Sequence, residues 1–178
     1  KLDPTYLIGG KLKTDDPHVK LGNSNYLITE TDESDPRFTT LKPHLVVLTN
    51  LDKEHLENYS NSYKNLEASM TQFINSIPFY GQAFINGDDK NSRRLLKAIN
   101  RETFTYGFKS TNQLNADNIT YCKNIMKFDL NYNKKSYAVS TNLLGKHNIY
   151  NILAAISVCI HLEIDINKIV KSVSNFYG

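Results

Sequence analysis

Acidic side chains and a histidine follow two apolar segments near the start of the chain. A first cluster follows residues 26–28 and consists of Glu30, Asp32, Glu33 and Asp35. A second cluster follows residues 45–48 and consists of Asp52, Glu54, His55 and Glu57. A short apolar run closed by polar residues is typical of a buried strand in a parallel sheet, and ligands of such sheets bind at the carboxyl ends of the strands. The two clusters therefore predict one site for a metal ion and phosphate.

Glu30 and His55 are the leading candidates for metal ligands. Mg²⁺ prefers hard oxygen ligands and keeps several waters and the phosphates of its nucleotide, so one or two carboxylates at strand ends are a suitable protein contribution. The alternative, a solvated acidic turn beside an exposed histidine, fits these residue types equally well. Two such turns after neighbouring strands favour the metal site.

Amide side chains at two further places could bind ligands. Asn50 ends the second apolar segment, where its amide could contact a substrate oxygen or simply cap the turn. Near a predicted helix start, His147, Asn148 and Asn151 could hold a nucleotide base or an anion together with backbone NH groups. Asn148 could equally be the helix N-cap and nothing else.

A common ATP site also needs a glycine loop of the form GxxxxGK[ST], which holds the phosphates. Gly10 and Lys11 are followed by leucine, and Gly145 and Lys146 are followed by histidine, so neither pair completes the motif. Either the site is not for ATP, or part of it is missing from this chain.

The elements that must position these residues alternate between strands and helices. A strand is predicted over 45–50, a helix over 63–77, a short strand over 83–86 and helical character over 92–99. This alternation predicts an α/β fold with a mostly parallel sheet flanked by helices.

The pattern changes in the second half of the chain. Short segments rich in Thr, Tyr, Phe and Val over about 103–143 predict a small antiparallel β subsection. A helix is then predicted to open near Asn148, and a last helix carries apolar residues over 166–176.

Composition restricts the partners and the compartment. The 178 residues fit one domain, and the 21 Lys and Arg against 18 Asp and Glu include no basic block of the kind that binds nucleic acid or a membrane surface. No apolar run reaches the ~18 residues of a membrane span. Cys122 and Cys159 lack metal-site spacing and are predicted to be reduced, buried thiols, which indicates the cytoplasm.

Several phrases of the sequence, in this order, resemble those of the Mur ligases. They are LDPTYLIGG, ETDESD, VVLTNLDKEHLENY, IPFYGQAFINGDD, TFTYGF and GKHNIYNILAA. The resemblance covers essentially residues 1–178 and implies most of the central ATP-binding domain, with a P-loop-type fold. It also implies that the glycine loop lies shortly before Leu2, and that an N-terminal UDP-sugar domain and a closing C-terminal domain are absent from this chain.

The resemblance implies an ATP- and Mg²⁺-dependent ligation in peptidoglycan synthesis. A muramate carboxylate takes the γ-phosphoryl group, and the amine of L-alanine then displaces phosphate from the acyl phosphate. The segment 77–81 favours this branch, which joins L-alanine to UDP-N-acetylmuramate. The alternatives are the branch that attaches a murein tripeptide, a non-catalytic nucleotide-binding module, and a folded remnant. The piece alone is expected to be inactive.

The resemblance also implies roles for single residues. Glu30 corresponds to a catalytic glutamate that binds Mg²⁺, and His55 to a metal-site histidine beside the muramate moiety. The segment with His147, Asn148 and Asn151 corresponds to the one that holds adenine.

Other acidic residues of these phrases have less direct roles. Asp32, Glu33 and Asp35 are expected to support the site. Glu54 and Glu57 replace the aspartates that are usual in the family, and each is one methylene longer. The longer side chain leaves open whether Glu54 orders the neighbouring histidine.

Overall fold

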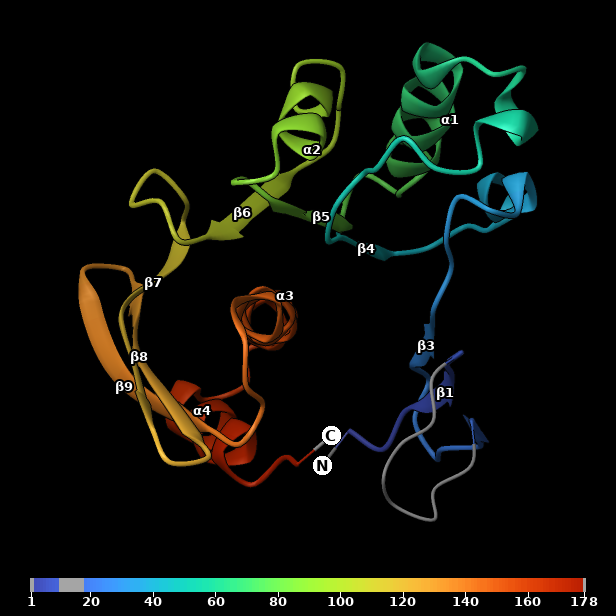
Figure 1. Cartoon of the computed structure of the whole chain (residues 1–178). Coiled ribbons are helices and arrows are strands. Elements are labelled where there is room, and N and C mark those ends of the chain that lie inside the picture. Colours follow the sequence, from blue (N-terminus) through green and yellow to red (C-terminus); the bar gives the residue numbers. More distant parts are fainter. Residues whose placement is uncertain (1, 10–17, 178) are drawn as a thin grey trace.

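The computed structural model describes residues 2–9 and 18–177, and its main element is a six-stranded sheet in the order β4-β5-β6-β7-β8-β9 (Figure 1). The strands are β4 Leu45–Leu48, β5 Gln82–Asn86, β6 Thr103–Gly107, β7 Leu114–Cys122, β8 Ile125–Tyr132 and β9 Lys135–Thr141. Strands β4 to β7 pair in parallel, whereas β7, β8 and β9 pair antiparallel. The predicted α/β fold with a mostly parallel sheet and an antiparallel subsection is confirmed.

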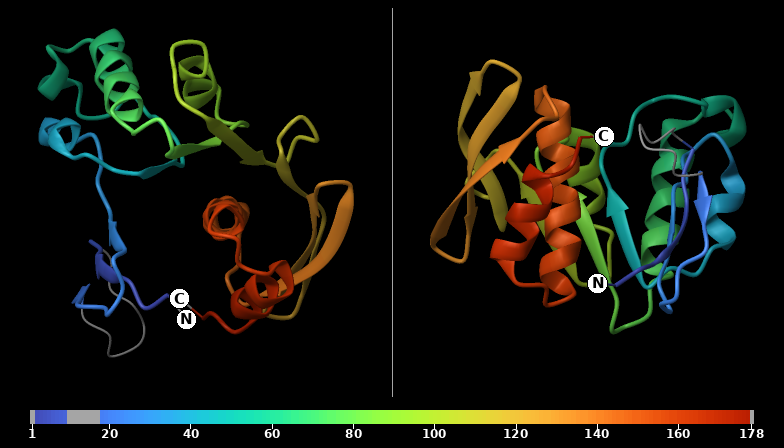
Figure 2. Two further views of the ribbon diagram at one scale, coloured as in Figure 1. Left: turned by 180° about the vertical axis from the view of Figure 1, so that it is seen from behind. Right: turned by 90° about the horizontal axis from the view of Figure 1, so that it is seen from below.

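Helices cover both faces of this sheet (Figures 1 and 2). Helices α1, Tyr63–Asn75, and α2, Lys90–Leu95, lie on the outer face. Helix α3, Lys146–His161, lies on the inner face against β5, β6 and β7, and α4, Ile166–Ser174, packs on β9 and α3. None of the helices in the described residues is long and apolar enough to span a membrane.

Strand β5 separates two hydrophobic clusters because both of its faces are covered. All five of its residues are buried. Phe84 packs in the inner cluster with Tyr106 and Ile149, whereas Ile85 packs in the outer cluster with Ile74. The continuous apolar run in the sequence therefore indicates a central strand buried on both sides.

Strand β6 differs from the expectation for residues 103–108. The sequence pattern assigns these residues to the antiparallel subsection, but β6 pairs in parallel with β5, with Phe84 opposite Phe104. A strand, helix and strand connection through α2 returns the chain in the same direction, and Thr, Tyr and Phe favour strands of either orientation. The antiparallel part therefore begins only at β7.

The first acidic cluster follows a strand of a separate small sheet. This sheet has the order β2-β1-β3, with β1 Thr5–Leu7, β2 Val19–Lys20 and β3 Leu27–Thr29. Leu27 and Ile28 are 67% and 55% exposed, so the prediction of a buried strand here is wrong. Neighbouring residues point to opposite faces of a strand, and therefore both faces of β3 are open within the described chain. Three apolar residues suit a strand, but burial also requires a layer on each face.

The two cysteines are free, and only one of them is shielded. Cys159 is half-buried in α3, where burial raises the pKa of its thiol. Cys122 is exposed at the end of β7, so the prediction of two buried thiols is wrong for this residue. Most residues in the second half of β7 are exposed to solvent.

Candidate functional site

Side chains tie the carboxyl ends of β4, β5 and β6 together. The Asn86 side-chain amide donates to the carbonyl oxygen of Thr49 at 2.9 Å, and the hydroxyl of Tyr106 donates to the carbonyl oxygen of Leu48 at 3.1 Å. Burial of the Tyr106 ring raises the pKa of its hydroxyl. One edge of the parallel sheet is thus held in a defined arrangement, and the loop that follows β4 carries Asn50 and His55.

Asn50 uses its side chain within its own turn. Its amide nitrogen donates to the Asp52 carboxylate at 2.6 Å, and the hydroxyl of Thr49 donates to its amide oxygen at 3.0 Å. These contacts favour the turn-capping interpretation of Asn50 in this conformation.

His55 adopts a left-handed backbone conformation with φ of 51°, directly before the 3₁₀ helix η2, Leu56–Tyr59. Non-glycine residues seldom adopt this conformation, although histidine does so more often than most. The side chain is 46% exposed, and its Nδ1 lies 3.6 Å from Oε1 of Glu57. The acid beside the His55 ring is therefore Glu57.

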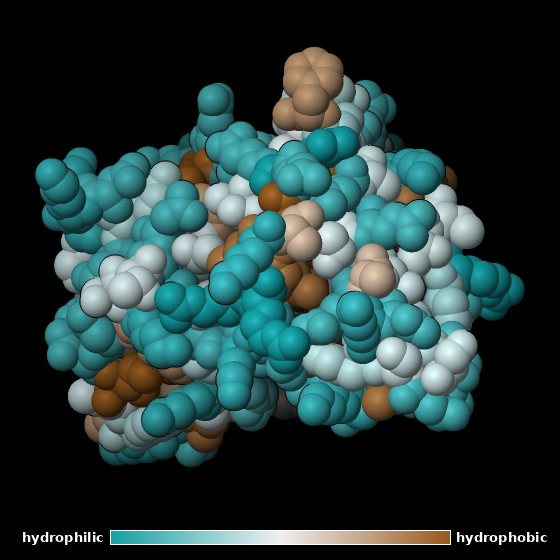
Figure 3. Space-filling model, turned by 90° about the horizontal axis from the view of Figure 1, so that it is seen from above, coloured by the Kyte–Doolittle hydropathy of each residue, from teal (hydrophilic) through white to brown (hydrophobic). Residues whose placement is uncertain are grey.

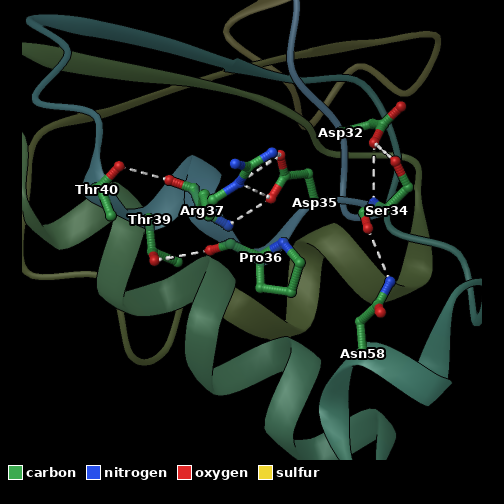
Figure 4. Close-up of polar contacts among 8 residues, drawn as sticks. All are labelled: Asp32, Ser34, Asp35, Pro36, Arg37, Thr39, Thr40 and Asn58. Carbon is green, nitrogen blue, oxygen red and sulfur yellow. Dashed lines mark hydrogen bonds and ion pairs between the residues drawn. The ribbon is translucent and has the colours of Figure 1, made fainter.

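The first acidic cluster is ordered by short-range hydrogen bonds (Figure 4). Asp32 accepts from the backbone NH of Ser34 at 2.9 Å and from its hydroxyl at 2.5 Å. These bonds are the main reason why the pKa of Asp32 is lowered, and the nearby charge of His55 lowers it further.

Asp35 caps the 3₁₀ helix η1, Pro36–Thr40, and binds the guanidinium group of Arg37 through both carboxylate oxygens (Figure 4). The Arg37 Nε atom lies 2.9 Å from each oxygen, and Nη2 lies 2.6 Å from Oδ2. The side-chain hydrogen bond from Arg37 lowers the pKa of Asp35 to about 2. The Asp35 carboxylate is therefore already paired with Arg37 within its own turn.

Contacts from η2 bring the two acidic clusters together. The Asn58 amide donates to the carbonyl oxygen of Ser34 at 2.7 Å, and the hydroxyl of Tyr59 donates to the carbonyl oxygen of Glu33 at 2.8 Å. The clusters therefore meet through loops, although β3 does not pair with β4. The sequence could not show this, because the connecting donors follow the second cluster and look like ordinary loop residues.

Glu30 lies at the end of β3 and turns toward the end of β1. Its Oε2 accepts from the backbone NH of Gly9 at 2.7 Å, and its own NH donates to the carbonyl oxygen of Leu7 at 3.0 Å. Within residues 2–9 and 18–177, no three His, Cys, Asp or Glu side chains are arranged around a common metal position. An exposed carboxylate is nevertheless a suitable donor for Mg²⁺, which takes few protein ligands and keeps its waters. The donor chemistry of Glu30 fits this ion.

The start of α3 presents free backbone donors beside His147, Asn148 and Asn151. Gly145 is the N-cap, with φ of 100° and no side-chain hydrogen bond to the first turn. Asn148 is not the N-cap: its amide donates to the carbonyl oxygen of Leu144 at 2.8 Å and so holds the preceding loop. His147 and Asn151 are exposed and free to contact a ligand.

Gly145 also approaches His147 closely. A Cβ atom at this position would lie 2.7 Å from Cε1 of the His147 ring, which is closer than side chains tolerate. Only glycine allows both the close approach of the His147 ring and the observed backbone conformation at this position.

Asp88 is the main structural residue that the sequence interpretation missed. Its Oδ2 accepts from the Phe108 NH at 2.5 Å and from the Tyr150 hydroxyl at 3.2 Å, and its Oδ1 accepts from the Asn112 amide at 3.0 Å. Burial and the charge of Asp88 raise the pKa of Tyr150 to about 12. Asp88 thus joins α3 to the sheet edge, whereas the sequence shows only an acidic turn.

Sequence comparisons place the chain among known proteins. The profile of the Mur ligase middle domain matches residues 16–159. The UDP-N-acetylmuramate--L-alanine ligase of Vesicomyosocius okutanii subsp. Calyptogena okutanii is 44% identical over 180 residues, which cover 100% of this chain and 38% of that protein. The enzyme of the same name from Hydrogenovibrio crunogenus is 41% identical and is covered to 39%. The chain therefore spans well under half the length of these curated relatives.

Solved structures share the fold. The UDP-N-acetylmuramate-alanine ligase of Thermotoga maritima superposes with a TM-score of 0.85 at 22% identity, over 99% of this chain and 39% of that one. The UDP-N-acetylmuramate:L-alanyl-gamma-D-glutamyl-meso-diaminopimelate ligase of Neisseria meningitides gives 0.84 at 21% identity, over 99% and 58%. A MurF ligase of Thermotoga maritima, solved in complex with ADP, gives 0.69 at 16% identity, over 94% and 42%. With the profile match over most of the sequence, these findings show that the chain belongs to the Mur ligase family.

Proposed function

We propose that this chain is the middle domain of a cytoplasmic ligase that joins L-alanine to UDP-N-acetylmuramate at the expense of ATP. The observation that carries the proposal is the identity of 44% over the whole chain to a relative named for this activity. The reaction belongs to peptidoglycan synthesis and so would serve cell shape and division. It proceeds through transfer of the γ-phosphoryl group to the muramate carboxylate, followed by attack of the L-alanine amine.

The nucleotide is proposed to bind at the start of α3. His147 and Asn151 are exposed there, beside backbone NH groups that lack a side-chain cap. Asn148 holds the loop before the helix, and Tyr150 ties the helix to Asp88 at the sheet edge. These contacts would keep the adenine-binding segment in a constant position relative to the carboxyl ends of the strands.

The muramate end is proposed to lie at the loops after β3 and β4. Glu30 would hold Mg²⁺, and His55 would complete the metal site beside the muramate carboxylate, with Asn50 near the substrate. The metal, when bound, neutralises charge on the transferring phosphoryl group. Asp32 and the Glu57 carboxylate 3.6 Å from Nδ1 of His55 would maintain the negative charge that a cation requires.

The measurement that tests the proposal is ADP release by the product of the complete open reading frame that contains this chain. The assay supplies UDP-N-acetylmuramate, ATP and Mg²⁺, with L-alanine and a murein tripeptide in separate reactions. Release that depends on L-alanine is the expected result. Dependence on the tripeptide would assign the chain to the peptide-attaching branch, and no turnover with either would reject the ligase activity. The isolated piece is expected to release no ADP above background.

Substitution of His55 by alanine provides a residue-level test. We expect the rate of ADP release to fall by about 100-fold or more, because charge stabilisation at a transferring group contributes on this scale. His44→Ala is the matched control: His44 is exposed at the opposite end of β4, where its ring contacts Tyr80. Equal losses in both variants would show a general effect on folding and would contradict the assigned role.

A further inference from the structure

A second concave site lies on the outer face of the sheet, between α2 and the loop that joins β6 to β7. This basic hollow has a volume of about 470 Å³ and is lined by Asp88, Lys90, Arg93, Arg94, Lys97 and Lys109. Figure 3 views the side of the molecule that carries α1 and α2, and its surface there is mainly hydrophilic. The start of α3 lies on the opposite face of the sheet (Figure 1). Asp88 lines the basic hollow and also accepts from Tyr150 of α3, so the hollow adjoins the proposed nucleotide site but has its own cationic lining.

The charge of the basic hollow exceeds that of the whole chain. Its five cations and one carboxylate give +4, whereas the chain carries a net charge of +3. All the remaining residues together therefore sum to −1. The 16 further Lys and Arg residues are offset by 17 Asp and Glu residues elsewhere, so the hollow carries the net positive charge of the chain.

Three of these cations lie on one side of α2. Lys90, Arg93 and Arg94 follow the spacing i, i+3 and i+4, and Lys97 lies in the turn after the helix. Like charges at such spacings repel one another and destabilise a helix. The Asp89 carboxylate, which caps α2 through its bonds to Ser92, offsets part of this repulsion. A bound anion would offset more of it.

Carboxylates of the protein balance only part of this charge. Arg94 lies 3.4 Å from Glu67, and Lys109 lies 3.9 Å from Asp88. In the part of the chain that the structure describes, Lys90, Arg93 and Lys97 form no ion pair within 4.0 Å. These side chains are available to a ligand.

We propose that the basic hollow binds a compact polyanion that carries two or more phosphate groups. Arginine binds phosphate oxygens in a bidentate manner and lysine adds point charge, so this set of side chains suits adjacent phosphates. The volume is of the size that holds a small ligand. Because the rest of the chain has a net charge of −1, an extended nucleic acid would gain little net electrostatic attraction outside the hollow.

Calorimetric titration with inorganic tripolyphosphate tests the proposal in the product of the complete open reading frame, with ADP and Mg²⁺ in excess so that the proposed nucleotide site is occupied. Arg93→Gln combined with Lys97→Gln removes two free cations that are exposed, so folding should be unaffected. We expect the double variant to bind tripolyphosphate at least about tenfold more weakly, and added salt to weaken binding by the wild-type protein. Orthophosphate should bind more weakly than tripolyphosphate.

Two control variants distinguish the basic hollow from the rest of the molecular surface. Lys168→Gln with Lys171→Gln removes the same charge from α4, where both side chains are exposed, and should leave the affinity for tripolyphosphate unchanged. His147→Ala with Asn151→Ala should also leave it unchanged, since the proposed nucleotide site is not involved. Unchanged binding in the Arg93 and Lys97 variant, orthophosphate binding as tight as that of tripolyphosphate, or tighter binding of a DNA duplex would overturn the proposal.

Discussion

The backbone of His55 combines an unusual conformation with an exposed, ionisable ring. A left-handed non-glycine residue costs of order 1–3 kcal/mol and persists only where its surroundings impose it. Here the residue precedes η2, whose Asn58 and Tyr59 hold the first acidic cluster. The conformation thus places the ring next to the junction of the two clusters, where the proposed chemistry needs it.

The contact between Asp35 and Arg37 leads to a prediction about acid stability. The folded pKa of Asp35 is lowered to about 2 from its ordinary value of 3.8, so its contribution to stability is present above about pH 4 and is lost as the pH falls toward 2. Arg37→Gln removes the main cause of this shift. We therefore expect the free energies of unfolding of wild type and variant to differ most above pH 4 and to converge as the pH falls, measured by urea unfolding.

The pH dependence of this difference in unfolding free energy distinguishes an electrostatic contribution of Arg37 from a packing contribution. A constant difference between the two proteins across this range would mean that Arg37 stabilises the chain by packing alone. Asp3 offers a comparison carboxylate in another part of the chain, because the side-chain hydrogen bond from Asn23 at 2.8 Å is the main cause that lowers its pKa. The curve of Asn23→Ala against wild type should show its own convergence, independent of the Arg37 substitution.

Residue types drew attention to the candidate site residues but did not reveal their contacts. The acidic clusters and the amides near α3 were visible because of their position after apolar runs or before a helix. The roles of Asp88 and Tyr150 were not visible, because they depend on contacts between residues 62 positions apart in the sequence. The apparent role of Asn148 as N-cap was wrong because Gly145 starts the helix earlier.

At the scale of elements, the start of α3 is the part most sensitive to substitution. Gly145→Ala would introduce a Cβ at φ of 100° and against the His147 ring. We expect the variant to be less stable by about 1–3 kcal/mol and to raise the KM for ATP more than it lowers kcat, since the segment proposed to bind the nucleotide would shift. Steady-state kinetics and thermal unfolding of the complete protein measure the two effects.

A double substitution separates the two causes. His147→Ala removes the ring that the new methyl group would meet but leaves the backbone strain. The stability cost of Gly145→Ala should therefore be smaller in the His147→Ala background, though not zero. An equal cost in both backgrounds would show that the ring moves away freely.

The boundaries of an element could be predicted from the sequence where the spacing of apolar residues agreed with the positions of capping residues and prolines. Helix α1 begins after Ser62, which caps it, and ends before Pro78, as expected from the spacing of Leu66 and Met70. Strand β6 was assigned the wrong partner direction because composition does not encode orientation. Strand β3 was expected to be buried because an apolar run cannot show whether a covering layer is present.

At the scale of the whole molecule, the two hydrophobic clusters share β5 and should unfold together. Phe84 and Ile85 are both fully buried but belong to opposite clusters. We expect Phe84→Ala to cost about 3–5 kcal/mol and Ile85→Ala about 2–5 kcal/mol, each within a single urea transition. Ile125→Ala, at a residue 40% exposed, should cost less than about 1 kcal/mol. Two separate transitions in either core variant would show that the clusters are independent units.

A continuous path of hydrogen bonds crosses the edge of the sheet. The Tyr150 hydroxyl donates to Asp88, whose NH donates to the Asn86 amide oxygen at 3.1 Å, and Asn86 in turn donates to Thr49. Groups linked in this way open cooperatively. The first turn of α3 and the loop after β4 should therefore exchange their amide hydrogens at matched rates, and Tyr150→Phe should accelerate exchange in both. The nucleotide end and the histidine end of the proposed site would then fluctuate as one unit.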